Sequence, residues 1–192
     1  MKELAGWAMA LPLVVLVAMT FVKFAVVLAV LQRAFGAVAV PPPSVTAILA
    51  LAFALFVTAP VLSRAWAAPT AARAAEPVRE FLAKHAPARE RQSFLELQRQ
   101  LRPAAERDAV TENDLVVLAP AFATAELKSA FAIGFLLFLP FLVIELLVST
   151  VLTSMGMTSL APELVALPFK LLLFVAADGW HLLFRGLVLG YT

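Results

Sequence analysis

The chain contains no cysteine, which excludes disulfide bonds, thiol nucleophiles and cysteine metal ligands. Its two histidines, His85 and His181, each lack a companion at metal-ligand spacing. Glycine is scarce, with 7 in 192 residues, and forms neither a Walker A sequence nor a dinucleotide-binding loop. No G-x-S-x-G nucleophile motif is present. We therefore expect a protein that is not an enzyme and that binds no metal or cofactor.

Charged residues are also few. They make up 15% of the chain, whereas 62% of the residues are hydrophobic, far from the composition of an ordinary soluble domain. The formal net charge of +2 comes from basic residues spread along the whole chain. Because no basic face with interleaved aromatic residues is formed, we expect no nucleic-acid partner. The composition predicts an all-α membrane protein with about four hydrophobic helical segments.

The first segment, residues 1–63, is predicted to be an N-terminal hydrophobic helical hairpin. Its first helix is interrupted only by Lys23 and is expected to end near Gly36. No small-residue cleavage site closes a short apolar core, so we interpret this helix as retained and not as a signal peptide. Residues 45–63 carry no charge and are long enough for one membrane crossing.

The second segment, residues 64–114, is predicted to be a small polar helical domain. It carries nine basic and eight acidic residues, unlike the sequence on either side. Apolar residues at helical spacing predict amphipathic helices over residues 77–85 and 88–101. Residues 111–114 (TEND) resemble a capping box, a weak signal for the start of the next helix.

The third segment, residues 115–192, is predicted to be a C-terminal hydrophobic helical hairpin. Between Ser129 and Pro162 its only charged residue is Glu145. This run is much longer than the roughly 20 residues of a single bilayer crossing. Because Pro140 lies in its middle, we expect a bend or a hairpin there.

Six charged residues lie in or beside the apolar segments. An ionised group facing lipid costs a few kcal/mol or more, so these side chains are expected to be buried between helices or between subunits. Their carboxylates also have the chemistry of a proton relay, although we favour a structural role over a relay. The six candidates are Lys23, Glu126, Lys128, Glu145, Lys170 and Asp178.

Lys170, Asp178 and Arg185 are separated by eight and seven residues. On one continuous helix they fall within about 80° of arc, so a charged stripe along one side is predicted. Neighbours in this stripe are about 11–12 Å apart, too far to pair directly. Their partners are therefore expected on other segments or other subunits, which predicts an assembly.

The residues described so far resemble the FliP/SctR family of flagellar and virulence type III export proteins. The N-terminal motifs are TFVKFAVVL at 20–28, LQRAFG at 31–36, PPP at 41–43 and TAP at 58–60. The central motifs are PAF at 120–122, ELK at 126–128, AF at 130–131, IGF at 133–135 and FLPFL at 138–142. The C-terminal motifs are LPFKLLLF at 167–174 and DGW at 178–180. Together they cover about residues 11–185, and residues 64–114 are the least distinctive part.

The resemblance implies a protein-conducting export gate in the bacterial inner membrane. In the family, five copies join two small companion membrane proteins, one FliQ/SctS-like and one FliR/SctT-like, and unfolded substrates pass through. The family's methionine-rich gasket loop would fall at residues 154–160, which makes Met155 and Met157 the candidate gate residues. Thr158 and Ser159 stand where methionine is common. The resemblance also places residues 64–114 on the periplasmic side, although the positive-inside rule favours the cytoplasm.

Two questions remain open at this level. An ion or proton channel, or a small transporter, is the alternative function, with the buried charges as its pathway. Transporters often contain internal repeats, and the sequence has no recognisable one. Flagellar and virulence proteins share the motifs above, and only the uncleaved-looking N-terminus favours the virulence type.

Overall fold

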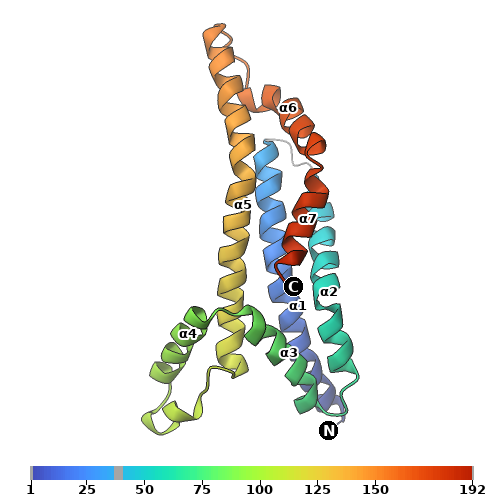
Figure 1. Cartoon of the computed structure of the whole chain (residues 1–192), viewed down its shortest axis with the longest axis vertical. Coiled ribbons are helices and arrows are strands. Elements are labelled where there is room, and N and C mark those ends of the chain that lie inside the picture. Colours follow the sequence, from blue (N-terminus) through green and yellow to red (C-terminus); the bar gives the residue numbers. More distant parts are fainter. Residues whose placement is uncertain (1, 37–40, 192) are drawn as a thin grey trace. The chain divides into compact units, whose positions relative to one another are not determined.

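A computed structural model describes the backbone of residues 2–36 and 41–191, with side chains from residue 11 onward except at 71 and 72. The described residues contain seven α-helices, one 3-10 helix and no strand. The all-α prediction is confirmed (Figure 1). The first two α-helices are α1 (Lys2–Phe35) and α2 (Pro43–Trp66), followed by α3 (Ala71–His85) and α4 (Ala88–Leu101). After the 3-10 helix η1 (Ala104–Ala109) come α5 (Leu115–Ser154), α6 (Pro162–Ala176) and α7 (Gly179–Leu189).

Three helices, α1 from Leu11, α2 and α5, are long and apolar enough to cross a membrane. The pair α6 and α7 passes the same test as one bent span, with an angle of 61° between its halves. By length and composition, the described residues therefore offer three candidate membrane spans, or up to four if the bent pair is one span. The sequence-based expectation of about four hydrophobic segments fits this result.

The chain divides into two compact units that do not follow the three sequence segments. Unit 1 comprises Met1–Lys23 and Ala52–Ser129, and unit 2 comprises Phe24–Leu51 and Ala130–Thr192. Helices α1, α2 and α5 each contribute to both units, whereas α3 and α4 belong to unit 1, and α6 and α7 to unit 2.

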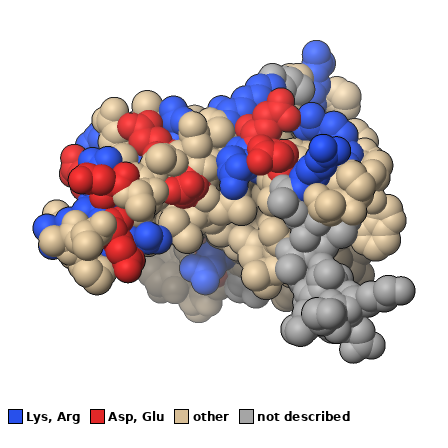
Figure 2. All heavy atoms as spheres, turned by 90° about the horizontal axis from the view of Figure 1, so that it is seen from below, with Lys and Arg blue, Asp and Glu red and all other residues tan. Residues whose placement is uncertain are grey.

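In unit 1, the polar segment folds onto the apolar helices through one face of α3. Ala74, Val78, Leu82 and Ala86 recur every four residues and are all buried. Helix α4 contributes Leu95, which packs with Val110 and Val117. The opposite faces are charged, and Figure 2 shows acidic and basic side chains interspersed on the end of the molecule where α3 and α4 lie.

The core of unit 2 is aromatic. The ring of Phe35 at the end of α1 packs edge-on against Phe141 of α5 and Phe174 of α6, with centroids 5.1 and 5.4 Å apart. Trp180 of α7 packs edge-on against Phe174 at 5.2 Å. Helices α1 and α5 approach closely at Gly134, where an added Cβ would lie 3.1 Å from the Val30 side chain. Small residues permit such close helix contacts in membrane proteins.

The predicted ends of α1 and α4 and the predicted C-terminal end of α3 are confirmed, whereas the predicted start of α3 is wrong. Helix α1 ends at Phe35, because Gly36 adopts a left-handed φ of +118° that ends helices readily. Helix α4 spans the predicted residues 88–101. Helix α3 was expected to begin at Pro77 but begins at Ala71, where Thr70 accepts a hydrogen bond from the Arg73 backbone N–H. Pro77 lies inside this helix.

Near the start of α5, the capping signal at residues 111–114 is formed in part. The Asp114 carboxylate accepts a hydrogen bond from the Thr111 backbone N–H at 2.8 Å. The helix begins at the next residue, Leu115. Of the bend or hairpin predicted at Pro140, the hairpin is wrong, because α5 is a single helix of 40 residues that continues through this proline (Figure 1). A proline is tolerated inside a long apolar helix because neighbouring groups can satisfy the freed carbonyl.

The predicted stripe of Lys170, Asp178 and Arg185 on one helix is also wrong. Helix α6 ends at Ala176 and α7 begins at Gly179, so Arg185 lies on a different helix from Lys170. Asp178 stands at the break with φ +49°. Asp and Asn adopt this left-handed conformation more readily than most residues. The motif DGW therefore marks a bend between two helices, and the spacing of the charged residues alone does not predict it.

Candidate functional site

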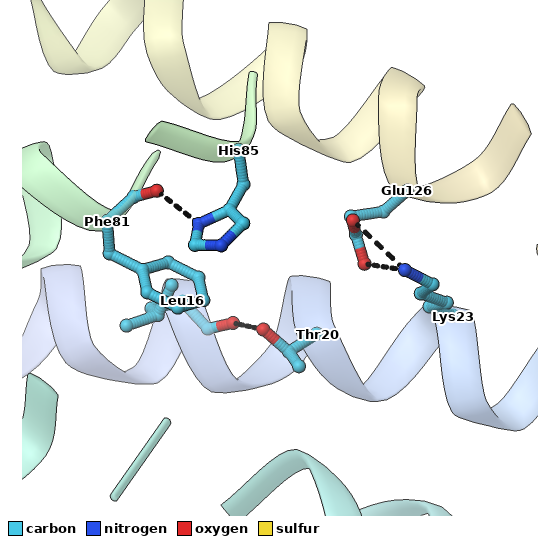
Figure 3. Close-up of polar contacts among 6 residues, drawn as sticks. All are labelled: Leu16, Thr20, Lys23, Phe81, His85 and Glu126. Atoms are coloured by element: carbon cyan, nitrogen blue, oxygen red, sulfur yellow. Dashed lines mark hydrogen bonds and ion pairs between the residues drawn. The ribbon is translucent and has the colours of Figure 1, made fainter. Parts of the chain in front are cut away.

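Lys23 and Glu126 form an ion pair in the interior of unit 1 (Figure 3). Lys23 comes from α1 and Glu126 from α5, and Lys23 Nζ lies 3.4 Å from Glu126 Oε2 and 3.5 Å from Oε1. Both side chains are almost completely buried. A charge removed from water in this way is stable only with a partner, so the pair ties α1 to α5.

The neighbouring polar groups in Figure 3 are satisfied locally. The Thr20 hydroxyl, one turn before Lys23, donates to the Leu16 carbonyl at 3.0 Å. His85 Nδ1 lies 2.8 Å from the Phe81 carbonyl oxygen, and the two rings are 4.3 Å apart. This histidine caps the end of α3 and has the surroundings of a packing residue.

Lys170 and Glu145 form a second pair, in unit 2. Lys170 Nζ of α6 lies 2.6 Å from Glu145 Oε2 of α5. The burial is unequal, since the lysine side chain is 1% exposed and the glutamate 31% exposed. The buried lysine charge is therefore compensated by this carboxylate, whereas the carboxylate itself is partly exposed on the surface of the chain.

Lys128 and Asp178, the remaining candidates, are not buried within the chain. Lys128 is 64% exposed, and its Nζ lies 2.7 Å from Glu90 Oε1 of α4. This hydrogen bond holds the pKa of the Glu90 carboxyl below its usual value. Asp178 is exposed at the break between α6 and α7. Burial of these two side chains between subunits stays a prediction.

Glu90 is a residue that the sequence reasoning did not select. It belongs to the polar segment, where eight acidic residues offer no reason to prefer one. Its side chain is only 12% exposed, which is low for an acidic residue on a water-facing helix. That burial is a property of the folded chain, so the sequence alone carries no signal for it.

Met155 and Met157 lie in the turn between α5 and α6, and both side chains are exposed. Gly156 between them has φ +75°. The Met157 backbone N–H donates to the Leu152 carbonyl at 2.9 Å and closes the end of α5 in a Schellman-type cap. The turn is thus ordered by its own backbone while its methionines face outward.

Among the described residues, no group of three or more histidine or acidic side chains is placed to hold a metal ion. The ion pairs of the described residues include the three given above and exposed surface pairs such as that of Arg64 and Glu80.

Comparison with known proteins identifies the family. The model of the FliP family matches residues 6–187, almost the whole chain. The chain belongs to the FliP family. The hypersensitivity response secretion protein HrcR of Ralstonia nicotianae is 42% identical over 198 aligned residues, covering 94% of this chain and 91% of the relative.

Further relatives of this FliP family chain come from virulence and flagellar systems. The Yop proteins translocation protein R of Yersinia pestis is 41% identical, over 94% of this chain and 90% of the relative. The flagellar biosynthetic protein FliP of Bacillus subtilis is 35% identical, over 91% of this chain and 83% of the relative. The chain is an inner-membrane component of an export apparatus of the type III secretion and flagellar class. Members of the FliP family are structural parts of that apparatus and have membrane-protein partners.

Proposed function

We propose that this protein is the core subunit of the export gate, the protein-conducting channel through which unfolded substrates leave the cytoplasm. In this proposal five copies assemble with a FliQ/SctS-like and a FliR/SctT-like membrane protein in the inner membrane. The gate moves polypeptide without chemical catalysis and needs no cofactor. Energy for transport comes from other parts of the apparatus.

The observation that carries the proposal is the exposed apolar surface of α5. This helix has 40 residues, which corresponds to a length of about 60 Å. In its most apolar stretch only 11% of the residues are buried. Large apolar side chains are exposed along the helix from Val116 to Val151.

A bilayer covers only part of such a surface. Its hydrocarbon core is about 30 Å thick, and even a helix tilted by about 40° crosses it within about 39 Å. Lipid therefore leaves a substantial length of α5 without an apolar environment. Other protein chains must cover the remainder, which supports an obligate membrane assembly and argues against a small transporter that works alone.

The proposed gate residues are Met155 and Met157. They project from the end of the turn that joins α5 and α6, where a ring of copies would bring several such turns together. The flexible, polarisable methionine side chain suits a seal that closes on itself and then deforms around varied peptides. Thr158 and Ser159 make this seal less apolar than a loop with four methionines.

The polar segment, residues 64–114, is proposed to lie on the periplasmic side. It approaches the length at which loops cross the membrane largely regardless of charge, so its nine basic residues do not prevent this orientation. Its surface mixes both signs of charge, as a water-facing surface does (Figure 2). The buried pairs Lys23–Glu126 and Lys170–Glu145 are proposed to hold helices together and not to conduct protons.

The test is the mass of the intact complex in a mild detergent, measured with and without the two companion proteins. A gate subunit gives a complex of about five copies that takes up the companions. A stable monomer or dimer that does not bind the companions would contradict the gate proposal and favour a channel or transporter. Single-channel conductance of the isolated chain, with Glu126→Gln as the pathway variant, would then separate those two alternatives.

A further inference from the structure

The hydrogen bonds of helix α5 are interrupted at Pro140. Proline has no backbone N–H, so it cannot donate to the carbonyl of Leu136, four residues earlier. Sharp bends of long helices occur at such prolines. Before this point α5 is held close to α1, because a Cβ added at Gly134 would lie 3.1 Å from the Val30 side chain. The part of α5 before Pro140 is therefore fixed in unit 2, and the part after it is free to bend.

A second interruption lies between α6 and α7. Asp178 has a φ of +49° at this point, and the two helices are bent by 61°. Residues at the ends of helices are common hinge positions, because they absorb changes of φ and ψ. We refer to residues 141–176, which lie between the two interruptions, as the arm. It contains the second part of α5, the turn with the two methionines, and α6.

The two interruptions lie on the same groove. This groove of about 580 Å³ in unit 2 is lined by Pro140 of α5 and by Ala177 and Gly179 at the bend. Apolar side chains of α5, α6 and α7 complete its lining. Two breaks on one groove define a single axis of rotation, and the groove supplies the space into which the arm moves.

The arm is held together as one body. Its α5 part and its α6 part are joined by the ion pair of Glu145 and Lys170, in which Nζ lies 2.6 Å from Oε2. At the far end, the bond from the Met157 backbone N–H to the Leu152 carbonyl closes the turn. Separating the two helices would leave the buried lysine charge uncompensated, so α6 follows α5 when the arm moves.

The arm contacts the end of α1 through aromatic rings. The Phe35 ring packs edge-on against Phe141, the first residue of the arm, and against Phe174 near its last residue. These contacts lie next to the two interruptions, so they stay close to the axis when the arm rotates. Segments with few buried contacts open at a low cost in free energy. Beyond Phe141, the α5 part of the arm exposes most of its large apolar side chains, among them Val143, Leu146, Leu147 and Val151.

We propose that the arm pivots as one body about Pro140 and the bend at residues 177–179. A rotation of about 20° is ordinary at a proline. It moves the end of α5 by about 8 Å, because about 15 residues of helix extend about 22 Å beyond Pro140. The turn that exposes Met155 and Met157 lies at that end, so the pivot changes the width of the opening. This effect rests on the proposed function, whereas the pivot is a property of this chain.

Pairs of spin labels test the pivot, and the absence of cysteine makes specific labelling possible. Ser159→Cys/Ile48→Cys places one label at the end of the arm and one on α2, whose start is tied to α1 by the hydrogen bond from Gln32 to Thr46. Ser159→Cys/Leu172→Cys places both labels on the arm. All three positions are exposed. Double electron–electron resonance of the detergent-solubilised full chain is expected to give a distance distribution at least twice as wide for the first pair as for the second.

Two proline variants locate the axis. Pro140→Ala restores the missing N–H, so it is expected to narrow the distribution of the Ser159→Cys/Ile48→Cys pair at least twofold without lowering the melting temperature. Pro60→Ala is the matched control, because Pro60 lies inside the exposed helix α2, and is expected to leave the width unchanged. Equal widths for the two label pairs, or the same effect of Pro60→Ala and Pro140→Ala, overturns the inference.

The consequence for the gate is measured separately. In planar bilayers that contain the complex assembled with its companions, Pro140→Ala is expected to lower the frequency of openings at least threefold, and Pro60→Ala to leave it unchanged. If the labels show the pivot but the openings do not respond to Pro140→Ala, the arm does not control the opening and that part of the inference is wrong. If the chain does not assemble with companions at all, the gate proposal fails, while the label distances of the isolated chain still decide whether the arm pivots.

Discussion

Lys23 and Glu126 are 103 residues apart in the sequence, yet their charged groups lie 3.4 Å apart inside unit 1. Both side chains are almost completely buried, so each charge needs a compensating partner. Removing one partner of such a pair leaves an uncompensated buried charge, which is more damaging than replacing both.

Lys23→Met is therefore expected to destabilise the protein by about 3–5 kcal/mol. The double variant Lys23→Met/Glu126→Leu is expected to recover most of that loss, because it leaves no buried charge. The measurement is the thermal melting of the detergent-solubilised chain and its yield in membranes. A double variant as unstable as Lys23→Met would show that the pair's charges themselves are required.

The pair of Lys170 and Glu145 is expected to respond asymmetrically. Glu145→Leu strands a lysine that is 1% exposed, so a loss of about 3–5 kcal/mol is predicted. Lys170→Met strands a glutamate that is 31% exposed, and its loss should be smaller because solvent or headgroups can reach the carboxylate. Thermal melting of the two single variants shows which one is less stable. Equal losses of stability would contradict the unequal burial of the two side chains.

The contact between Glu90 of α4 and Lys128 of α5 predicts that the packing of α4 against α5 depends on pH. Because Lys128 holds the pKa of Glu90 below its usual 4.5, the folded state favours the ionised carboxylate. The resulting stabilisation is complete above about pH 4.5 and is lost as the pH falls through the lowered pKa. The protection factors of the α4 amides, which are exchange rates corrected for the intrinsic slowing of amide exchange at lower pH, should therefore fall on acidification of the complete protein.

The matched control for that experiment is Lys128→Met. It removes the cause of the shift, so the protection factors of the α4 amides should be lower at neutral pH and should change less between neutral and acidic conditions. An acid response that is the same in the wild type and in Lys128→Met would assign the effect to another group.

The close packing around Gly179 predicts that the bend between α6 and α7 does not tolerate a larger residue at this position. A Cβ at this position would overlap the Phe174 ring, so Gly179→Ala forces the ring or the bend to move. A loss of about 1–3 kcal/mol is expected, typical of overpacking. Gly186→Ala on the same helix meets open space and should melt within about 0.5 kcal/mol of the wild type. Equal melting of the two variants would mean that the bend is not packed as described.

The gate proposal predicts that the side chains of Met155 and Met157 limit leakage. The double variant Met155→Ala/Met157→Ala is expected to raise ion conductance of the assembled complex in planar bilayers, because smaller side chains leave the seal open. Met155→Leu/Met157→Leu keeps the apolar volume and should leak less than the alanine variant. Both variants should melt like the wild type, since these side chains are exposed.

The sequence predicted elements best where a residue acts locally. Gly36 ends α1 where the sequence predicted, because a glycine with positive φ changes the backbone at its own position. The same reasoning was wrong at Pro77 and Pro140, because the helices α3 and α5 continue through these prolines. It was also wrong at Asp178, where a left-handed aspartate divides one predicted helix into two.

The charged residues show a different limit. Composition selected Lys23, Glu126, Glu145 and Lys170, because charges are rare in apolar segments. It did not pair them, since pairing depends on the register between helices that lie far apart in the chain. Glu90 was missed for a related reason: its burial arises only when α4 lies beside α5.

The turn at Gly156 has a consequence for how such proteins diverge. Its cap is made of backbone hydrogen bonds, and the space around the Gly156 Cβ position is empty. Substitutions at the flanking positions therefore alter what the turn presents without disturbing the packing of either helix. In the proposed gate, residues such as Thr158 and Ser159 can therefore differ between proteins and change how tightly the turn seals, while the helices that carry the turn keep their packing.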